Sequence, residues 1–272
     1  MKKYQLPDQS QVRRLFTFGC SFTDYNFDTW ANILGDYYSK SEFYNYGAPG
    51  AGNVAIASKI TQASILHQFN EDDLIVVCWT SFLRESRILS DQNQWANTGS
   101  VLTNKFYDIK FTKKFVNKTH YLLETLTQIH LVQSLLSGTG SRFYYLFMMH
   151  PLETESNEDR LIQSLDINPK VLTTYSTNLE YYHKIHSFET VLNSSENRKQ
   201  MFLPKDEHPS PLGHGVYLNN VFDIDLDKID FDDKIRRSKK AVETWSLKSK
   251  SKSQRHYHTF RKSDPLHPAI FH

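Results

Sequence analysis

Short apolar runs alternate with helix-like segments along most of this 272-residue chain, and each run stops at a turn rich in glycine, serine or proline. The clearest run spans residues 72–81, where Leu74 to Trp79 are continuously apolar, as in a strand buried on both faces. Three further runs fit the same pattern. The four predicted strands lie within residues 15–21, 41–53, 72–81 and 141–151.

The segments between these runs carry apolar side chains at helical spacing. One begins near Trp30, with Asp28 as its predicted N-cap, and a second runs from the glycine-rich turn to about Phe69. A third covers residues 119–136 and stops at Gly138. Strands that alternate with helices in this way imply a central parallel sheet with helices on both faces. The sequence therefore predicts a single α/β domain.

Composition excludes several other classes of protein. Hydrophobic residues make up 39% of the chain and aromatic residues 14%, which is too apolar for a disordered chain. No apolar run is long enough for a transmembrane helix, and the N-terminus lacks the apolar core of a secretory signal. Two cysteines do not make a disulfide framework. We therefore expect a soluble, cytoplasmic protein with no membrane partner.

The formal charge of +2 hides a division between two parts of the chain. Residues 234–272 contain 11 Lys and Arg against 2 Asp and Glu, which leaves 21 basic and 28 acidic residues for 1–233. We expect residues 1–245 to form the domain and residues 246–272 to form a basic, disordered tail. Such a tail can bind nucleic acid, but a solvated terminus is the favoured interpretation.

Polar residues gather where the predicted strands end, and in open α/β sheets ligands bind beyond those carboxyl ends. Ser21 follows the first strand, and a serine becomes a nucleophile when a histidine takes its proton. His208, with Asp206 two residues earlier, supplies a base and its orienting acid from one late loop. Backbone N–H groups of Ser21 and of the turn around Gly50 are candidate oxyanion donors. Further candidates are the hydroxyl groups of Thr80 and Ser81, while Asn53, Ser81 and Arg84 are candidate substrate-binding residues.

The order of these segments resembles the SGNH/GDSL hydrolases, and more closely a phage- and marine-microbe-like branch with G-C-S-F-T early and D-x-H-P late. The resemblance covers roughly residues 13–222. It implies a flavodoxin-like three-layer α/β/α sandwich with a central parallel sheet, the SGNH hydrolase fold, and an esterase or acetylesterase activity. It makes Ser21 the nucleophile, His208 the base, Asp206 the orienting acid and Gly50 an oxyanion glycine. It also suggests a phage- or virus-encoded protein.

Three positions depart from the family pattern. Cys20 stands where the family usually has Asp, and Thr80 stands where an oxyanion Asn is usual. Lys205 occupies the usual position of the acid, because Asp206 lies one residue nearer His208. A Ser–His dyad without an acid is therefore an open alternative. So is a non-catalytic ligand- or glycan-binding module on the same fold, and so, more distantly, is a thiol hydrolase that uses Cys20.

Residues 82–118 form a long insertion between the third strand and the long helix. Segments of that length are often lids or binding loops, although a plain surface excursion is equally consistent. Its aromatic residues beside Arg84 would suit a sugar ring, so an O-acylated carbohydrate is one candidate ester substrate; they are Trp95, Phe106, Tyr107 and Phe111. We expect no metal, because no histidine spacing typical of a zinc site occurs, and no nucleotide cofactor, because no phosphate-binding motif occurs. The oligomeric state stays open.

Overall fold

A computed structural model of the chain describes residues 4–89, 94–103, 106–151, 170, 186–204, 208–222, 224, 229–250 and 258–259. Its centre is a parallel sheet with the strand order β2-β1-β3-β6. The strands are β1 (Arg14–Gly19), β2 (Glu42–Gly47), β3 (Asp73–Trp79) and β6 (Arg142–Phe147). All seven residues of β3 are buried, which explains its uninterrupted apolar sequence.

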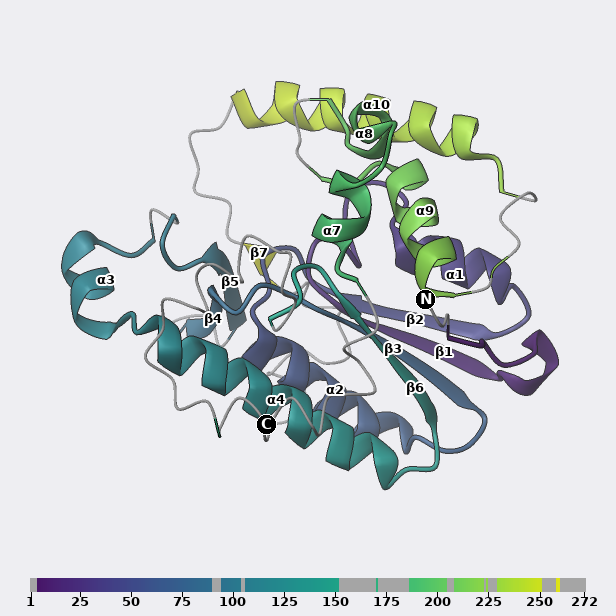
Figure 1. The fold of residues 1–272 in the computed structure, drawn as a ribbon, viewed down its shortest axis with the longest axis horizontal. Coiled ribbons are helices and arrows are strands. Elements are labelled where there is room, and N and C mark those ends of the chain that lie inside the picture. Colours follow the sequence, from purple (N-terminus) through teal and green to yellow (C-terminus); the bar gives the residue numbers. More distant parts are fainter. Residues whose placement is uncertain are drawn as a thin grey trace.

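Helices cover both faces of this sheet, as Figure 1 shows. The pair α2 (Asn53–His67) and α4 (Lys118–Ser137) lies on one face, and α1 (Trp30–Tyr37) lies with α9 (Pro211–Val221) on the other. The short helices α7 (Phe188–Asn193) and α8 (Arg198–Met201) pack beside α9, and η1 (Gln9–Gln11) precedes β1. The predicted three-layer α/β/α architecture with a central parallel sheet is confirmed. The strand order is also that of flavodoxin-like sheets.

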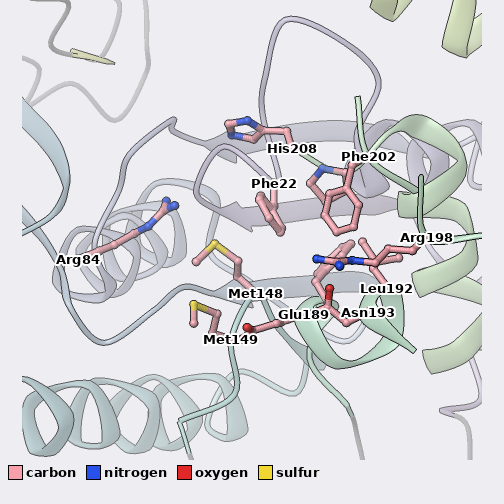
Figure 2. Close-up of a pocket in the computed structure, with 12 residues that line it drawn as sticks. Phe22, Arg84, Met148, Met149, Glu189, Leu192, Asn193, Arg198, Phe202 and His208 are labelled. Atoms are coloured by element: carbon pink, nitrogen blue, oxygen red, sulfur yellow. The ribbon is translucent and has the colours of Figure 1, made fainter. Parts of the chain in front are cut away.

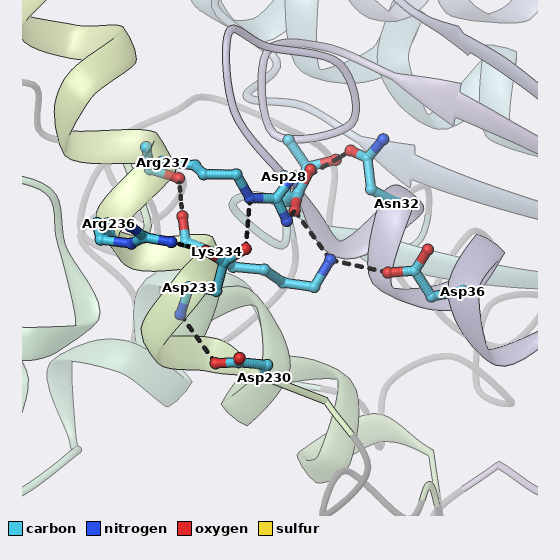
Figure 3. Close-up of polar contacts among 10 residues, drawn as sticks. Asp28, Asn32, Asp36, Asp230, Asp233, Lys234, Arg236 and Arg237 are labelled. Atoms are coloured by element: carbon cyan, nitrogen blue, oxygen red, sulfur yellow. Dashed lines mark hydrogen bonds and ion pairs between the residues drawn. The ribbon is translucent and has the colours of Figure 1, made fainter.

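The start of α1 differs from the prediction, because Thr29 and not Asp28 is the N-cap. Thr29 forms a capping box with Asn32, which satisfies the first N–H groups of the helix. Asp28 instead accepts a hydrogen bond from Nζ of Lys234 at 2.8 Å, and the same Nζ lies 2.8 Å from Asp36 (Figure 3). These contacts attach α10 (Phe231–Lys250) to α1.

The C-terminal boundary expected at residues 245 and 246 falls inside α10, which continues to Lys250. A later pair of residues, β7 (His258–Thr259), forms an antiparallel ladder with β5 (Gln94–Ser100). The rest of the predicted tail lies outside the described residues, so its disorder stays a prediction. Among the helices that the structure describes, none combines the length and the apolar character that a bilayer-spanning segment requires.

The insertion at residues 82–118 contains regular structure. A hairpin of β4 (Arg84–Leu89) and β5 is followed by α3 (Ile109–Phe115), at the left in Figure 1. Tyr107 stacks on Phe111 with ring centroids 4.7 Å apart, and the guanidinium of Arg87 lies over both rings. Trp95 is buried. Tyr107 and Phe111 thus pack on each other within the insertion, whereas Trp95 belongs to the main core, and the role of the segment as a lid stays a prediction.

Candidate active site

The carboxyl edge of the sheet contains a topological switch point between β1 and β3. From β1 the chain proceeds to β2 on one side, and β3 then pairs with β1 on the other side. Crossover connections therefore diverge at the ends of β1 and β3 and leave a crevice there. Ser21 lies two residues after β1, and Thr80 lies directly after β3. The fold thus places the predicted nucleophile where such sheets bind ligands.

A tight turn after β1 presents Ser21. The N–H groups of Thr23 and Asp24 both donate to the carbonyl of Cys20, at 2.9 and 3.1 Å. Gly19 is required by close packing, since a Cβ there would lie 2.1 Å from Thr23 Oγ1 and 2.9 Å from the backbone oxygen of Cys78. Ser21 itself is only 4% exposed. The chain at Gly19 therefore packs directly against the backbone of the neighbouring strand β3.

The side chains of Thr29 and Asn45 hydrogen-bond to the backbone of this turn. The carbonyl of Thr23 accepts hydrogen bonds from Thr29 Oγ1 at 2.7 Å and from Asn45 Nδ2 at 3.0 Å. Oδ1 of Asn45 in turn accepts from the Thr17 hydroxyl and from the backbone N–H of Gly47. Asn45 thereby connects β2, β1 and the turn that carries Ser21. These roles could not be predicted from the sequence, because the contacts of Asn45 with Thr17 and Thr23 join residues 28 and 22 positions apart.

His208 comes from a short loop that is fixed at both ends. Its carbonyl accepts from Leu203 N–H at 3.0 Å, and Ser210 N–H donates to the carbonyl of Met201 at 2.7 Å. Ser210 is also the N-cap of α9, with Pro211 at the first helical position, an arrangement that stabilises a helix start. Asp206, the predicted orienting acid, lies outside the described residues.

The structure brings Ser21 and His208 together from positions 187 residues apart. Ser21 Oγ lies 2.9 Å from His208 Nε2, which is hydrogen-bonding distance. The ring of Tyr25 stacks on the imidazole with centroids 4.2 Å apart and an interplanar angle of 17°. Phe22 approaches the same ring edge-on at 5.8 Å. Two aromatic side chains therefore hold the imidazole in the plane from which Nε2 reaches the serine.

A second histidine, His214, lies close to this site but differs from His208 in its surroundings. It is 1% exposed and contacts the rings of Phe22 and Phe188. Burial, with a smaller contribution from the nearby His208, lowers the pKa of His214 to about 3. His214 is therefore neutral at physiological pH and adds no positive charge beside the imidazole of His208.

Two residues predicted to bind the oxyanion or the substrate, Thr80 and Asn53, are buried and hydrogen-bonded within the protein. Thr80 is buried, and its Oγ1 donates to Met148 Sδ at 3.5 Å. Asn53 is 3% exposed; its Nδ2 donates to Thr80 O and Thr125 Oγ1, and its Oδ1 accepts from Thr80 N–H. These bonds make Asn53 a clamp between α2, α4 and the end of β3. The geometry thus favours structural roles for the Asn53 side chain and the Thr80 hydroxyl over the predicted roles.

The glycine-rich turn after β2 is the place where the hairpin docks. Gly50 has a positive φ of 77°, and a Cβ there would lie 2.7 Å from the backbone oxygen of Asn97 in β5. At Gly52 a Cβ would lie 2.6 Å from the backbone oxygen of Arg84. Both glycines therefore allow β4 and β5 to approach the sheet, and this approach positions Arg84. The oxyanion role of Gly50 stays a prediction.

Both cysteines are fully buried and free of disulfides. Sγ of Cys20 lies 3.8 Å from Met148 Sδ, within the buried core. Burial raises the pKa of the Cys78 thiol well above its usual range. This arrangement favours the inert interpretation of both thiols over a thiol nucleophile.

A pocket of about 480 Å³ opens beside His208, and Figure 2 shows its lining. Its apolar lining consists of three phenylalanine rings, two thioethers, Leu192 and Pro209. Arg84 and Arg198 lie toward opposite sides of the methionines in this view. The remaining polar side chains are Glu189, Asn193 and His208. Ser81, the other predicted contact, is 8% exposed and accepts a hydrogen bond from Leu83 N–H. Among the described residues, no cluster of three His, Cys, Asp or Glu side chains is arranged to hold a metal ion.

Comparison with known proteins gives matches at the level of structure alone. The chain matches no known protein family and no curated protein. Similar solved structures include a member of the lipolytic G-D-S-L family from Veillonella parvula, with a TM-score of 0.43, 13% identity and coverage of 76% of this chain and 94% of that chain. Another is a GDSL-like lipase from Bacteroides thetaiotaomicron, with a TM-score of 0.42, 13% identity and coverage of 79% and 88%. A third is a catalytic mutant of an acetylxylan esterase from Geobacillus stearothermophilus, with a TM-score of 0.42, 13% identity and coverage of 77% and 94%. Every one of these TM-scores is below 0.5.

Proposed function

We propose that this protein is a serine hydrolase that cleaves carboxylic esters, with Ser21 as nucleophile and His208 as general base. The observation that carries the proposal is the 2.9 Å separation of Ser21 Oγ and His208 Nε2 at the switch point of the sheet. A hydroxyl paired with an imidazole in this way is the arrangement that activates serine for acyl transfer. The pocket beside His208 gives an ester room to bind.

The chemistry follows from this pair. Ser21 Oγ attacks the ester carbonyl while its proton passes to His208 Nε2, and the carbonyl oxygen becomes an oxyanion. Collapse of this intermediate breaks the bond to the alcohol, which leaves with the proton from His208. Water then attacks the acyl-Ser21 ester with His208 again as base, which releases the acid and restores Ser21.

Backbone N–H groups of Ser21 and Gly50 are the proposed oxyanion donors, and Asp206 is the proposed orienting acid. The Thr80 hydroxyl is directed to Met148 Sδ, so it does not replace the missing amide of the family pattern. One absent oxyanion donor costs about 100- to 1000-fold in rate. We therefore expect slow turnover of unactivated esters and faster turnover of esters with good leaving groups.

Labelling with a fluorophosphonate probe, followed by peptide mapping, tests this proposal. The probe should modify Ser21 in the native protein and should fail to label a Ser21→Ala variant. Cys20→Ala serves as the matched control, because it removes the neighbouring nucleophile and should leave labelling intact. Labelling that persists in Ser21→Ala, or that is lost in Cys20→Ala, would contradict the assignment of the nucleophile.

The position of Thr80 also favours a second candidate function, a non-catalytic ligand-binding module on the same fold. With the Thr80 hydroxyl turned to Met148, the pocket lacks a side-chain oxyanion donor at that position. Such a module would bind a ligand and turn over no acetyl ester. Hydrolysis of a simple acetyl ester that disappears in His208→Ala would eliminate this alternative.

A further inference from the structure

Arg84 places a guanidinium group in the pocket next to His208. It is the first residue of β4, and its backbone is fixed by a hydrogen bond from its N–H to Ser81 O at 3.1 Å. Its side chain lines the pocket together with Met148 and Met149, as Figure 2 shows. Nη1 of Arg84 is buried and has no hydrogen-bond partner.

Neither Glu85 nor Glu189, which lines the same pocket, forms an ion pair with the guanidinium of Arg84. Glu85, the next residue, forms an ion pair with Arg87 at 2.6 Å and accepts from the Tyr121 hydroxyl at 2.8 Å. The guanidinium of Arg84 makes no ion pair with any carboxylate in the part of the chain that the structure describes. A buried N–H that loses its water without gaining a partner destabilises the protein, so such a group is a typical ligand contact.

Three other arginines in the described ranges each form an ion pair with a carboxylate. Arg14 is paired with Asp73, Arg87 with Glu85, and Arg237 with Asp28. Arg84 differs from these three because it lines a pocket without a carboxylate partner among the described residues. A bidentate carboxylate is the partner that best fits the planar fork of a guanidinium.

The remainder of the pocket indicates what kind of molecule would bring that carboxylate. Between Arg84 and the far side of the pocket lie the thioethers of Met148 and Met149 and the ring of Phe22. These side chains suit a short apolar segment, and methionine adapts to its shape. A ligand that fills this space therefore combines an apolar middle with a negatively charged end.

We infer that the preferred substrate is an ester that carries a carboxylate, which pairs with the guanidinium of Arg84 while Ser21 attacks the ester carbonyl. This inference rests on the proposed function and narrows its substrate class. The carboxylate can belong to the acyl group or to the alcohol, since both flank the carbonyl. Arg84 is in this scheme a residue that determines specificity, and it takes no part in proton transfer.

Matched pairs of charged and neutral esters test the inference. For the acyl side, the mono-para-nitrophenyl ester of glutarate is compared with para-nitrophenyl valerate. For the alcohol side, para-acetoxybenzoate is compared with para-acetoxybenzamide. In the native protein kcat/KM should favour the charged member of at least one pair on the order of 10- to 100-fold, as expected for a charge-assisted hydrogen bond.

Arg84→Gln should lower the ratio of kcat/KM between the charged and the neutral ester to about 1, mainly by raising KM for the charged ester. Arg84→Lys keeps the positive charge but lacks the planar guanidinium group, so it should retain part of the preference for the charged ester. Arg198→Gln is the matched control, because it removes an exposed arginine from the same pocket and should leave the ratio of kcat/KM between the charged and the neutral ester unchanged. An equal loss in Arg198→Gln would indicate a general charge effect and would overturn the pairing with Arg84.

Binding measurements separate failure of this inference from failure of the proposed function. Calorimetry would compare para-acetamidobenzoate with para-acetamidobenzamide, which are not esters, in the native protein and in Arg84→Gln. Carboxylate binding that depends on Arg84, without any Ser21-dependent hydrolysis, would keep the anion site and refute the esterase. Ser21-dependent hydrolysis with no charge preference, and no Arg84-dependent carboxylate binding, would refute the anion site and keep the esterase.

Discussion

Two arginines at opposite edges of the central sheet have opposite surroundings. At the amino edge, Arg14 donates from Nε and Nη2 to the carboxylate of Asp73, at 2.6 and 2.7 Å, and the Asp73 side chain is fully buried. At the carboxyl edge, Arg84 lines a pocket and pairs with no carboxylate of the described residues. The protein itself supplies the carboxylate that pairs with Arg14, whereas a ligand is the proposed source of the carboxylate for Arg84.

The difference extends to the other polar groups of the two edges. Asp73 also accepts from Asn70 N–H at 2.8 Å, so the amino edge is closed by bonds within the protein. At the carboxyl edge the Ser21–His208 pair lies beside a cavity. A buried ion pair cannot lose one partner without a large penalty, whereas a catalytic pair can often be altered without unfolding the domain. Substitutions at the two edges should therefore separate stability from activity.

The largest effect is expected from His208→Ala at the carboxyl edge. Loss of the base should lower kcat/KM for para-nitrophenyl acetate by about 1000-fold or more, because Ser21 then has no group to take its proton. Thermal unfolding should change little, since His208 is only partly buried. Activity that survives in this variant would mean that another group serves as the base.

Asp73→Ala at the amino edge should show the reverse pattern. It leaves the guanidinium of Arg14 without its partner, and removal of one member of such a pair costs about 3 to 5 kcal/mol of unfolding free energy. Activity per folded molecule should not change, because the substitution lies at the other end of β3. Denaturant unfolding measures the loss, and Asp72→Ala, at the exposed neighbouring acid, is the control. A loss as large in Asp72→Ala would show that the effect is not specific to the ion pair.

Most of the sheet was predictable because buried parallel strands are continuously apolar. The segment that became β3 is the clearest example, and Gly138 ends α4 as expected. The hairpin was not predicted, because β4 has no buried residue and therefore no apolar run to reveal it. The prediction of Asp28 as the N-cap of α1 was wrong. Asp28 and Thr29 are both residue types that cap helices, and the Asp28 carboxylate forms an ion pair with Lys234 instead.

The candidate site was predictable only in part. Ser21 and His208 lie in local motifs at a strand end and before a helix cap, so the sequence alone indicated them. Tyr25 and Asn45 were missed, because each acts across elements whose pairing the sequence does not show. Asn53 carries the right chemistry for a substrate contact, yet its amide bonds inward to Thr80. Side-chain direction was thus the information that the sequence lacked.

Acid should weaken the fold through His214, a buried histidine near the carboxyl edge. Its pKa is lowered from 6.5 to about 3, so the unfolded chain binds a proton between these values that the native protein does not bind. The free energy of unfolding therefore falls as pH falls through this range, by about 2 kcal/mol between pH 7 and 5. In His214→Leu this part of the loss should vanish, whereas His120→Leu, on an exposed position of α4, should leave the pH dependence unchanged. Equal pH dependence in the native protein and in His214→Leu would contradict the assignment.

The smallest expected effect concerns how each edge holds its reactive side chain. A carboxylate fixes Arg14, whereas the flat stack with Tyr25 at 4.2 Å fixes the imidazole of His208. An aromatic pair contributes about 0.5 to 1.5 kcal/mol, so Tyr25→Ala should lower kcat by about 2- to 10-fold with little change in KM. Tyr25→Phe keeps the ring and should restore kcat, and Tyr37→Ala, on the distant helix α1, should not alter it. If Tyr25→Phe were as slow as Tyr25→Ala, the hydroxyl and not the stacked ring would position the base.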